Sequence, residues 1–326
     1  MHHTRRHILT GAGAVLLVPH GIRRAATNDY PNKPVRLIVA SAPGGPSDVP
    51  ARLASQILAA KLNQPFIVEN RPGAGGALGA RVVATAPPDG YTLLTGNSST
   101  LAAIPAVSDS AGYDPVKDFA PVVRINEGFQ ILVVHPDAPW KTVKDFVEDA
   151  KANPGKINYG HTGPGGLPHL AGELFMLRSG ARLSGVSYRS GGESITAALG
   201  KTIQATFENI AILRSMISEA KVRALGVQNK TRTPLLPEVP TMEEAGVPDC
   251  EANTFFGVVA PAGTPLDIAK KLSDAMNEGL ATPEMQKTII GFGSEAKPNS
   301  PEEFAAYIAA QHKKWVAVGK AANLKI

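Results

Sequence analysis

Two glycine-rich loops hold the residues best suited to chemistry. The first, APGGPSD at 42–48, follows the apolar run VRLIVA, and the second, GHTGPGG at 160–166, follows INYG. Glycine lets a chain turn sharply and lets its backbone approach a ligand closely. Each loop joins an expected strand to an expected helix, so backbone N–H groups and the positive end of a helix dipole face outward. The pattern favours an anion site that needs no charged side chain.

The first loop has an anion-binding interpretation and a plain one. Gly44 and Gly45 supply the sharp turn, and either Ser47 or Asp48 can cap the helix that follows. Pro50 is tolerated only in the first turn of that helix. Taken alone, the loop is equally typical of an ordinary strand-to-helix turn. Its recurrence in the second half of the chain favours two parts of one site.

The second loop adds a hydroxyl and a histidine to its glycines. Thr162, Gly163 and Gly165 allow exposed amides, and His169 lies in the first turn of the next expected helix. A catalytic His169 would need a nucleophile nearby, and the sequence places none there. A structural histidine, hydrogen-bonded across the base of the loop, is the favoured interpretation, because polar groups inside proteins are usually partnered.

Three further polar loops follow expected strands. They offer Asn97 and Ser98, then Ser190 with the amides of the two glycines after it, and then Asn209. These are neutral hydrogen-bonding groups of the kind that orient a ligand in a small polar pocket. Each is also a common helix-capping residue, so each alone indicates a cap as readily as a ligand contact.

Signatures of catalysis and of bound metals or nucleotides are missing from the sequence. The triplet Gly200–Thr202 resembles the end of a P-loop, but Ile195 stands where the loop needs glycine, and a strand follows where the loop needs a helix. No GxSxG or HExxH motif occurs. The single cysteine, Cys250, excludes an intramolecular disulfide and a cysteine-based zinc site, and it is expected to fill the core. We therefore predict a protein that is not an enzyme, with no catalytic residues, metal or cofactor.

The first 26 residues have the composition of an export signal. They hold four arginines, among them the pair Arg5–Arg6, no acidic residue, and a short apolar run. This pattern resembles a twin-arginine signal, with a basic tail as the alternative. The formal charge of +5 falls to +1 without this segment, which gives no reason to expect nucleic acid as a partner. We expect a cleaved signal at 1–26 and a periplasmic protein.

The rest of the chain alternates short β-branched runs with longer amphipathic ones, which predicts mostly parallel sheets with helices on both faces. We expect two α/β lobes joined by two crossing strands, near 125–134 and 253–260. The expected lobe 1 comprises residues 30–129 plus 253–326, and lobe 2 comprises 130–252. Two helices are expected to close the chain. Ligands of such sheets bind beyond the carboxyl ends of the strands, where both glycine loops fall.

Several ordered blocks then resemble one known family. They include YPNKPVRLIVASAPGGPSD, VENRPGAGGALGA, PPDGYTLL, YDPVKDFAPV, PGKINYG with PHLAGELF, LPEVPTMEEAG, FFGVVAPAGTP and SPEEFAAYI. They extend over essentially all of the chain after residue 26. On these blocks the chain resembles the solute-binding receptors of tripartite tricarboxylate transporters, the Bug family. The resemblance implies a type II periplasmic binding fold whose two lobes close on a small carboxylate.

The resemblance also implies a ligand site and partners. Backbone groups of the two glycine loops are expected to hold the ligand's carboxylate, usually without a salt bridge. The implied ligand-binding positions are Pro43, Gly44, Gly45, Ser47, Asp48, Asn97, Ser98, Thr162, Gly163, Gly165, His169, Ser190 and Asn209. The expected partners are a mono- or dicarboxylate and the permease subunits of a tripartite tricarboxylate transporter, with a sensor kinase as another partner if the receptor instead presents its ligand for sensing.

Some residues depart from the family pattern. Pro46 removes one N–H donor from the first loop. YRSGGES replaces a lysine-glycine-serine sequence, and Glu208–Asn209 replaces an aspartate-asparagine pair. These positions are expected to border the far end of the ligand. A dicarboxylate, an aromatic acid and an amino acid all fit the pattern, and the remaining alternative is an exported hydrolase or lyase that uses His169 and a loop serine.

Overall fold

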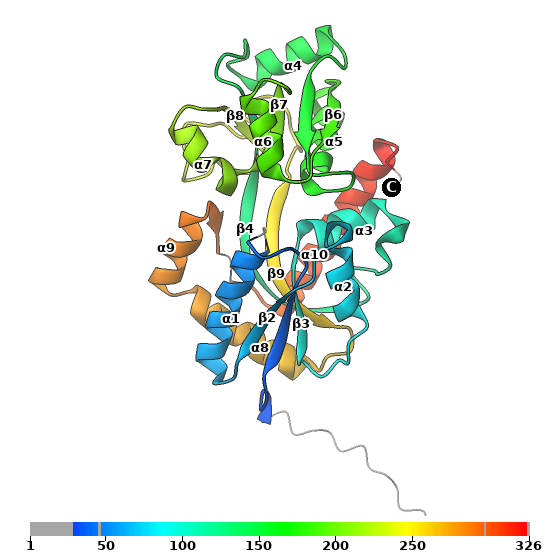
Figure 1. The fold of residues 1–326 in the computed structure, drawn as a ribbon, viewed down its shortest axis with the longest axis vertical. Coiled ribbons are helices and arrows are strands. Elements are labelled where there is room, and N and C mark those ends of the chain that lie inside the picture. The colour runs from blue at the N-terminus through cyan, green and yellow to red at the C-terminus, as the bar shows by residue number, and fades with distance from the viewer. Residues whose placement is uncertain (1–28, 45–46, 297, 325–326) are drawn as a thin grey trace, which may run out of the picture. The chain divides into compact units, whose positions relative to one another are not determined.

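The computed structural model describes residues 29–44, 47–296 and 298–324. The chain divides into a short unit, Met1–Tyr30, and a main unit, Pro31–Ile326, to which the helices and strands below belong. Figure 1 labels most of the helices and strands of the main unit. The expected export signal at 1–26 lies outside the described residues, as do Gly45 and Pro46 of the first glycine loop.

The strands are short and apolar, apart from two long ones. Many of their buried residues are valine, isoleucine, leucine or phenylalanine, which suit a pleated and buried surface. The strands are β1 (Val35–Val39), β2 (Phe66–Asn70), β3 (Thr92–Asn97), β4 (Phe119–Val134), β5 (Asn158–His161), β6 (Ser184–Ser187), β7 (Ala205–Asn209), β8 (Arg223–Val227), β9 (Asn253–Pro261) and β10 (Ser294–Glu295).

The helices follow the strands and cover the sheet. Several begin at side-chain caps: both Thr142 and Ser300 form complete capping boxes. The α-helices are α1 (Asp48–Leu62), α2 (Ala77–Ala84), α3 (Ile104–Val107), α4 (Val143–Ala152), α5 (Leu167–Ser179), α6 (Gly191–Leu199), α7 (Ile210–Ser218), α8 (Leu266–Leu280), α9 (Pro283–Gly291) and α10 (Pro301–Ala321). Shorter helical turns are η2 (Ala74–Gly76), η3 (Ser99–Ala103) and η4 (Asp109–Ala111).

The strands have two parallel groups with an antiparallel centre. Their order is β2-β1-β3-β9-β4-β7-β5-β6, and both β8 and β10 pair with β4. The strand β1 is parallel to β2 and β3, and β5 is parallel to β6 and β7. The strand β4 pairs antiparallel with both β9 and β7, so one continuous strand belongs to both groups (Figure 1). The predicted fold class, two α/β lobes joined by crossing strands, is confirmed, whereas the expected lobe boundaries stay a prediction.

Three expectations about the elements were wrong or incomplete. The strand β4 already begins at Phe119, before the expected crossing strand near 125–134, because its long ladder with β9 overrides the loop-like composition around Pro121. The helical turn η3 and helix α3 were not expected. Helix α9 was missed too, so three helices rather than two follow β9. Its signal was present, since Thr282 caps it and Pro283 opens it.

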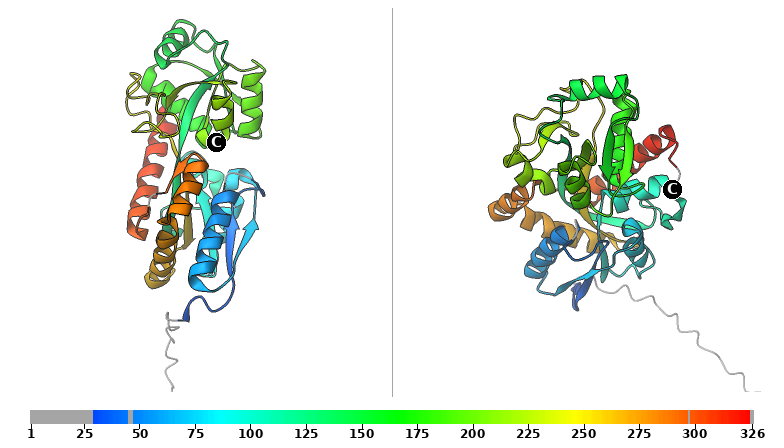
Figure 2. Two further views of the ribbon diagram at one scale, coloured as in Figure 1. Left: turned by 90° about the vertical axis from the view of Figure 1, so that its left-hand side faces the viewer. Right: turned by 45° about the horizontal axis from the view of Figure 1, so that its top comes forward.

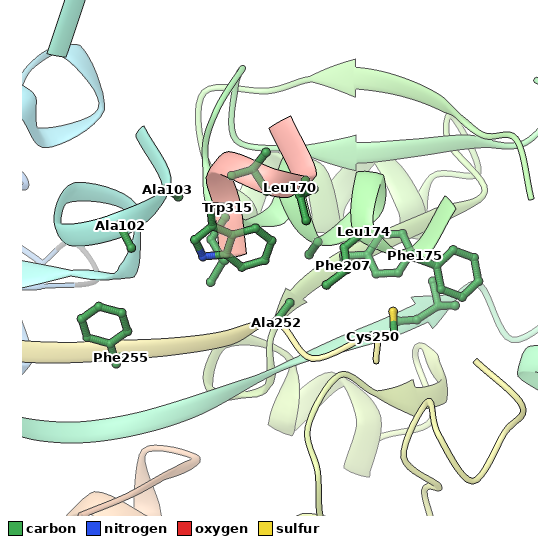
Figure 3. Close-up of a cluster of buried hydrophobic side chains, with 14 of the residues drawn as sticks. Ala102, Ala103, Leu170, Leu174, Phe175, Phe207, Cys250, Ala252, Phe255 and Trp315 are labelled. Atoms are coloured by element: carbon green, nitrogen blue, oxygen red, sulfur yellow. The ribbon is translucent and has the colours of Figure 1, made fainter. Parts of the chain in front are cut away.

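Helix α10 ties the two groups of strands together through the core. Figures 1 and 2 show it, in orange to red, alongside both the cyan and the green parts of the main unit, and it contacts both η3 and α5. Its Trp315 is fully buried beside Leu170 of α5, in the same apolar cluster as Ala102 (Figure 3). Cys250 is a buried member of this cluster, as expected for a core residue.

A buried carboxylate fastens the two long strands to α10. Glu127 of β4 accepts hydrogen bonds from Asn253 Nδ2 of β9 at 2.8 Å and from the Tyr307 hydroxyl of α10 at 2.9 Å. The Arg124 guanidinium donates to the same carboxylate at 3.1 Å. A buried charge of this kind is tolerated when it is paired and hydrogen-bonded. The contacts join the middle of β4 to the start of β9, and both strands border the cavity described next.

Candidate binding site

One cavity of about 510 Å³ lies where several helices begin. Four sets of lining residues come from the starts of helices: Gly44, Val49 and Pro50 at α1, Thr162, Leu167 and Pro168 at α5, Ser190, Gly191 and Gly192 at α6, and Asn209, Ala211 and Ile212 at α7. The first turn of a helix has N–H groups without intrahelical partners, and its dipole is positive there. Four such ends around one cavity create a setting that attracts an anion.

Asp48 anchors the first loop from inside. Its Oδ2 accepts the Gly44 N–H at 3.0 Å and the Arg52 Nε–H at 2.9 Å, and Asn70 Nδ2 donates to Oδ1 at 2.9 Å. The hydrogen bond from Arg52 is the main reason why the pKa of Asp48 falls to about 2. Gly44 has a φ of 74°, a conformation that favours glycine. Asp48 therefore stays ionised and holds the loop, and the Gly44 N–H is used within the protein.

Asn97 links the first loop to the end of β3. Its Nδ2 donates to Ser47 Oγ at 2.9 Å, and its Oδ1 accepts the Thr100 N–H at 3.0 Å. Ser47 is fully buried, so its hydroxyl supports Asn97 from behind. Asn97, Ser98 and Ser99 line the cavity. Ser99 Oγ also accepts the Leu167 N–H at 3.4 Å, which joins this corner to the start of α5.

Two neighbouring histidines with tilted rings shape the second loop. His161 Nδ1 accepts the Gly163 N–H and His169 Nδ1 accepts the Gly165 N–H, both at 3.2 Å. The two rings lie 4.4 Å apart between centroids. Burial, with a smaller effect from His161, lowers the pKa of His169 to about 4. His169 is thus a neutral acceptor across the base of the loop, in agreement with its structural interpretation.

Ser190 and Asn209 combine two roles that the sequence left open. Ser190 Oγ accepts the Glu193 N–H at 3.2 Å and caps α6, and Asn209 Oδ1 accepts the Ala211 N–H at 2.8 Å and caps α7. Both residues also line the cavity. Asn209 Nδ2 lies against Gly128 of β4, where an added Cβ would stand 2.8 Å from it.

The structure brings about half of the sequence-predicted site residues to the cavity. Gly44, Asn97, Ser98, Thr162, Ser190 and Asn209 line it. Six others are not among the lining residues: Pro43, Ser47, Asp48, Gly163, Gly165 and His169. All of these except Pro43 make the hydrogen bonds given above, which hold the loops in place. Gly45 lies outside the described residues. Ligand contact stays a prediction for all of them.

Sequence reasoning missed the cavity wall formed by the central strands. Asn126 and Gln130 of β4, Thr254 and Phe256 of β9, and Ser294 of β10 line it. A usable signal was the alternation Asn126, Gly128, Gln130, because residues two apart in a strand share one face. An apolar part of the lining was missed as well, and it comprises Val49, Leu53, Ile212, Ile289 and Phe292.

Glu208 is the most unusual lining residue. Its side chain is 4% exposed, and its Oε1 has no hydrogen-bond partner in the protein. Removal from water disfavours the charged form and raises the pKa of Glu208 to about 8, against a smaller opposing effect of the Asn209 N–H. Its Oε2 packs on the start of α6, where a Cβ on Gly191 would stand 2.8 Å away.

The described part of the chain offers little for metal chemistry. No group of three or more His, Cys, Asp or Glu residues within it is arranged to hold a metal ion. Each helix in the same residues is too short or too polar to span a bilayer.

Comparison with known proteins identifies the family. The model of the tripartite tricarboxylate transporter family receptors matches residues 50–324. The chain belongs to this family.

Three relatives are similar to this receptor over most of its chain. The protein BugT of Bordetella pertussis is 31% identical over 96% of both chains. An R. palustris protein solved with adipate is 31% identical, has a TM-score of 0.82, and matches 91% of this chain and 99% of its own. The periplasmic binding protein BugD is also 31% identical, with a TM-score of 0.79 over the same shares. The resemblance to Bug-family receptors is confirmed: this receptor binds a solute, has the type II periplasmic binding fold, and is not an enzyme.

Proposed function

We propose that this receptor is an exported periplasmic protein that captures a small organic carboxylate and delivers it to a tripartite tricarboxylate-type permease. The observation that carries the proposal is the convergence of four helix N-termini on one cavity lined by neutral polar groups. The relative solved with adipate supports the choice of a carboxylate, and the composition of residues 1–26 supports export.

The cavity suits a carboxylate without a cationic side chain. No Lys, Arg or His occurs among the cavity residues that the structure describes. Amide and hydroxyl donors must then provide the attraction, and in a site with little water such hydrogen bonds are stronger than at the surface. The helix dipoles add a favourable potential at the starts of α1 and α5.

Closure of the two lobes around the ligand provides the transport signal. The cavity residues come from both parts of the chain assigned to lobe 1 and from the part assigned to lobe 2. A ligand that touches both lobes at once stabilises their closed arrangement, because it binds that arrangement more tightly than an open one. The permease would recognise the closed form.

The binding experiment compares charged ligands with neutral ones of the same shape. Adipate, hexanoate and neutral adipamide are titrated into ligand-free protein, with melting temperature and calorimetry as readouts. We expect the carboxylates to raise the melting temperature and adipamide to leave it unchanged. Equal binding of adipamide, or no binding by any carboxylate tested, would overturn the carboxylate assignment.

A pair of threonine variants locates the site. Thr162→Val removes a hydroxyl from the cavity with little change of shape, and Thr202→Val does the same at an exposed turn outside the cavity. We expect Thr162→Val to weaken carboxylate binding by about tenfold, the usual effect of one lost hydrogen bond. Thr202→Val should bind as the wild type does.

Delivery is tested in cells. Disruption of the gene should abolish uptake of the identified ligand, while induction of its catabolic genes should persist when the ligand enters by another route. Loss of induction with uptake intact would assign the receptor to sensing instead.

A further inference from the structure

Three of the side chains that line the cavity are large, apolar and exposed. Val49, Ile212 and Phe292 are 43%, 46% and 45% exposed, respectively. They come from the first turn of α1, from the start of α7 and from the residue that follows α9. A single exposed apolar side chain is common on a protein surface, but several around one cavity indicate a place where a bound molecule removes apolar surface from water.

Two of these helices have an apolar face toward the cavity. Val49 and Leu53 lie four residues apart on α1, and Ile289 lies three residues before Phe292 at the end of α9. Residues three or four apart share one face of a helix. All four residues line the cavity, so the faces that α1 and α9 contribute to its lining are both apolar.

The turn that includes Phe292 is held against α7. The Arg214 Nη1–H donates to the Gly291 carbonyl at 2.8 Å. Gly293, with a φ of 73°, lies so close to the backbone of Ala211 that an added Cβ would stand 3.1 Å from it. Phe292 lies between these two contacts, so its backbone is fixed beside the start of α7.

The apolar side chains lie away from the second glycine loop. Figure 1 shows α7 and α9 on one side of β4 and β9, and α5, which follows the second glycine loop, on the other side. Thr162 and Ser99 belong to the α5 side, where Ser99 Oγ accepts the Leu167 N–H. The cavity therefore has a polar end at the start of α5 and an apolar end at α7 and α9.

A charged group has no partner at the apolar end. The described lining residues include no lysine, arginine or histidine, and Arg214 is engaged by the Gly291 carbonyl. Glu208 is 4% exposed, so it offers little surface to a cation. A charge placed at this end would lose its water without gaining an ion pair, which is costly. A hydrocarbon group would instead gain from leaving water.

We propose that this receptor selects monocarboxylates with an apolar body, whose carboxylate lies at the starts of α1 and α5 and whose hydrocarbon part lies against Val49, Ile212 and Phe292. This inference rests on the proposed carboxylate-binding function and names its ligand class. An aliphatic chain or an aromatic ring supplies the apolar surface that this end of the cavity can cover. A dicarboxylate of the same length would place its second charge there.

A chain-length series measures the contribution of the apolar end. Propanoate, butanoate, pentanoate and hexanoate are titrated into ligand-free protein at pH 7, with calorimetry as the readout. Each added methylene group that leaves water should tighten binding about fourfold. An affinity that does not change with chain length would overturn the inference, because the exposed side chains would then not contact the ligand.

Two charged analogues test the preference for an apolar body. Adipate and 6-aminohexanoate share the carbon chain of hexanoate but have a negative or a positive charge at its far end, and adipate is the molecule present in the solved relative. We expect both to bind at least about tenfold more weakly than hexanoate. If either binds as tightly as hexanoate, the inference fails and the carboxylate receptor stays in place. If none of the acids binds, the proposed function fails and this inference fails with it.

Two pairs of variants assign the preference to the apolar end. Val49→Thr puts a hydroxyl in the cavity, and Val116→Thr makes the same change at a side chain that is 48% exposed outside it. Phe292→Ala removes the ring from the cavity, and Leu177→Ala truncates a side chain that is 47% exposed elsewhere. We expect each cavity variant to weaken hexanoate binding about five- to tenfold and propanoate binding less, while both controls bind as the wild type does. An unchanged chain-length series in both cavity variants, shown to be folded by circular dichroism, would overturn the inference.

Discussion

The buried Glu208 should make the ligand-free receptor less stable as the pH rises. The folded protein holds the Glu208 proton up to about pH 8, whereas the ordinary pKa is 4.5. The folded state therefore binds more protons between these values, and the free energy of unfolding falls as the pH rises through that range. Glu208→Gln, which is neutral throughout, removes this dependence.

The size of the effect follows from the pKa difference. Each pKa unit corresponds to about 1.4 kcal/mol, so Glu208 costs the wild type about 3 kcal/mol at pH 7 relative to a neutral side chain. At pH 5 the cost is about 1 kcal/mol or less by the same relation. We thus expect Glu208→Gln to be clearly more stable than wild type at pH 7 and nearly equal to it at pH 5.

Urea unfolding of ligand-free protein at several pH values measures this difference. Other titrating groups cancel because they are common to both proteins. Glu148→Gln, at an exposed carboxylate on α4, is the control and should follow the wild type. Parallel stability profiles for wild type and Glu208→Gln between pH 5 and 8 would refute the argument that burial keeps this carboxyl protonated.

Three further outcomes concern the scaffold of the site. Asp48→Asn should lower the free energy of unfolding at neutral pH by about 1–3 kcal/mol, as expected for lost charged hydrogen bonds. Because the folded pKa of Asp48 is lowered to about 2, this difference from wild type should disappear as the pH falls through that value. Urea unfolding at a series of acidic pH values measures it. The folded pKa of His169 is lowered to about 4, so the free energy of unfolding should fall as the pH drops from 6.5 to 4. In the same urea experiments, the free energy of unfolding of His169→Asn should depend less steeply on pH over this range. Gly172→Ala places a Cβ 2.4 Å from the Tyr159 ring and should cost about 1–3 kcal/mol by overpacking, while Gly200→Ala should melt within a few degrees of wild type.

Local sequence patterns were enough to predict most of the elements around the site. The strand VRLIVA and the helix after Ser47 are marked by apolar periodicity and glycine turns, which act over a few residues. The start of β4, residues 119–124, was missed because Pro121 looks like a loop residue. Pairing with β9, more than a hundred residues away, makes that segment a strand, and no local pattern encodes such a partner.

The same distinction explains the site. Asn97, Thr162 and Ser190 could be predicted because loop chemistry after a strand is visible in sequence. Asp48 was expected at the ligand, but its oxygens are occupied by Gly44, Arg52 and Asn70, and only the folded geometry reveals that competition. The unpartnered oxygen atoms of Asn126, Gln130 and Glu208 were missed for a related reason, since a lack of partners is a property of packing.

The most direct test of the central claim is a crystal structure of the receptor with the carboxylate that binds most tightly among those titrated. We expect the ligand's carboxylate to lie within about 3 Å of N–H or hydroxyl groups at the starts of both α1 and α5. A ligand on the outer surface, or one that contacts only residues before β4 or only residues after it, would contradict the account.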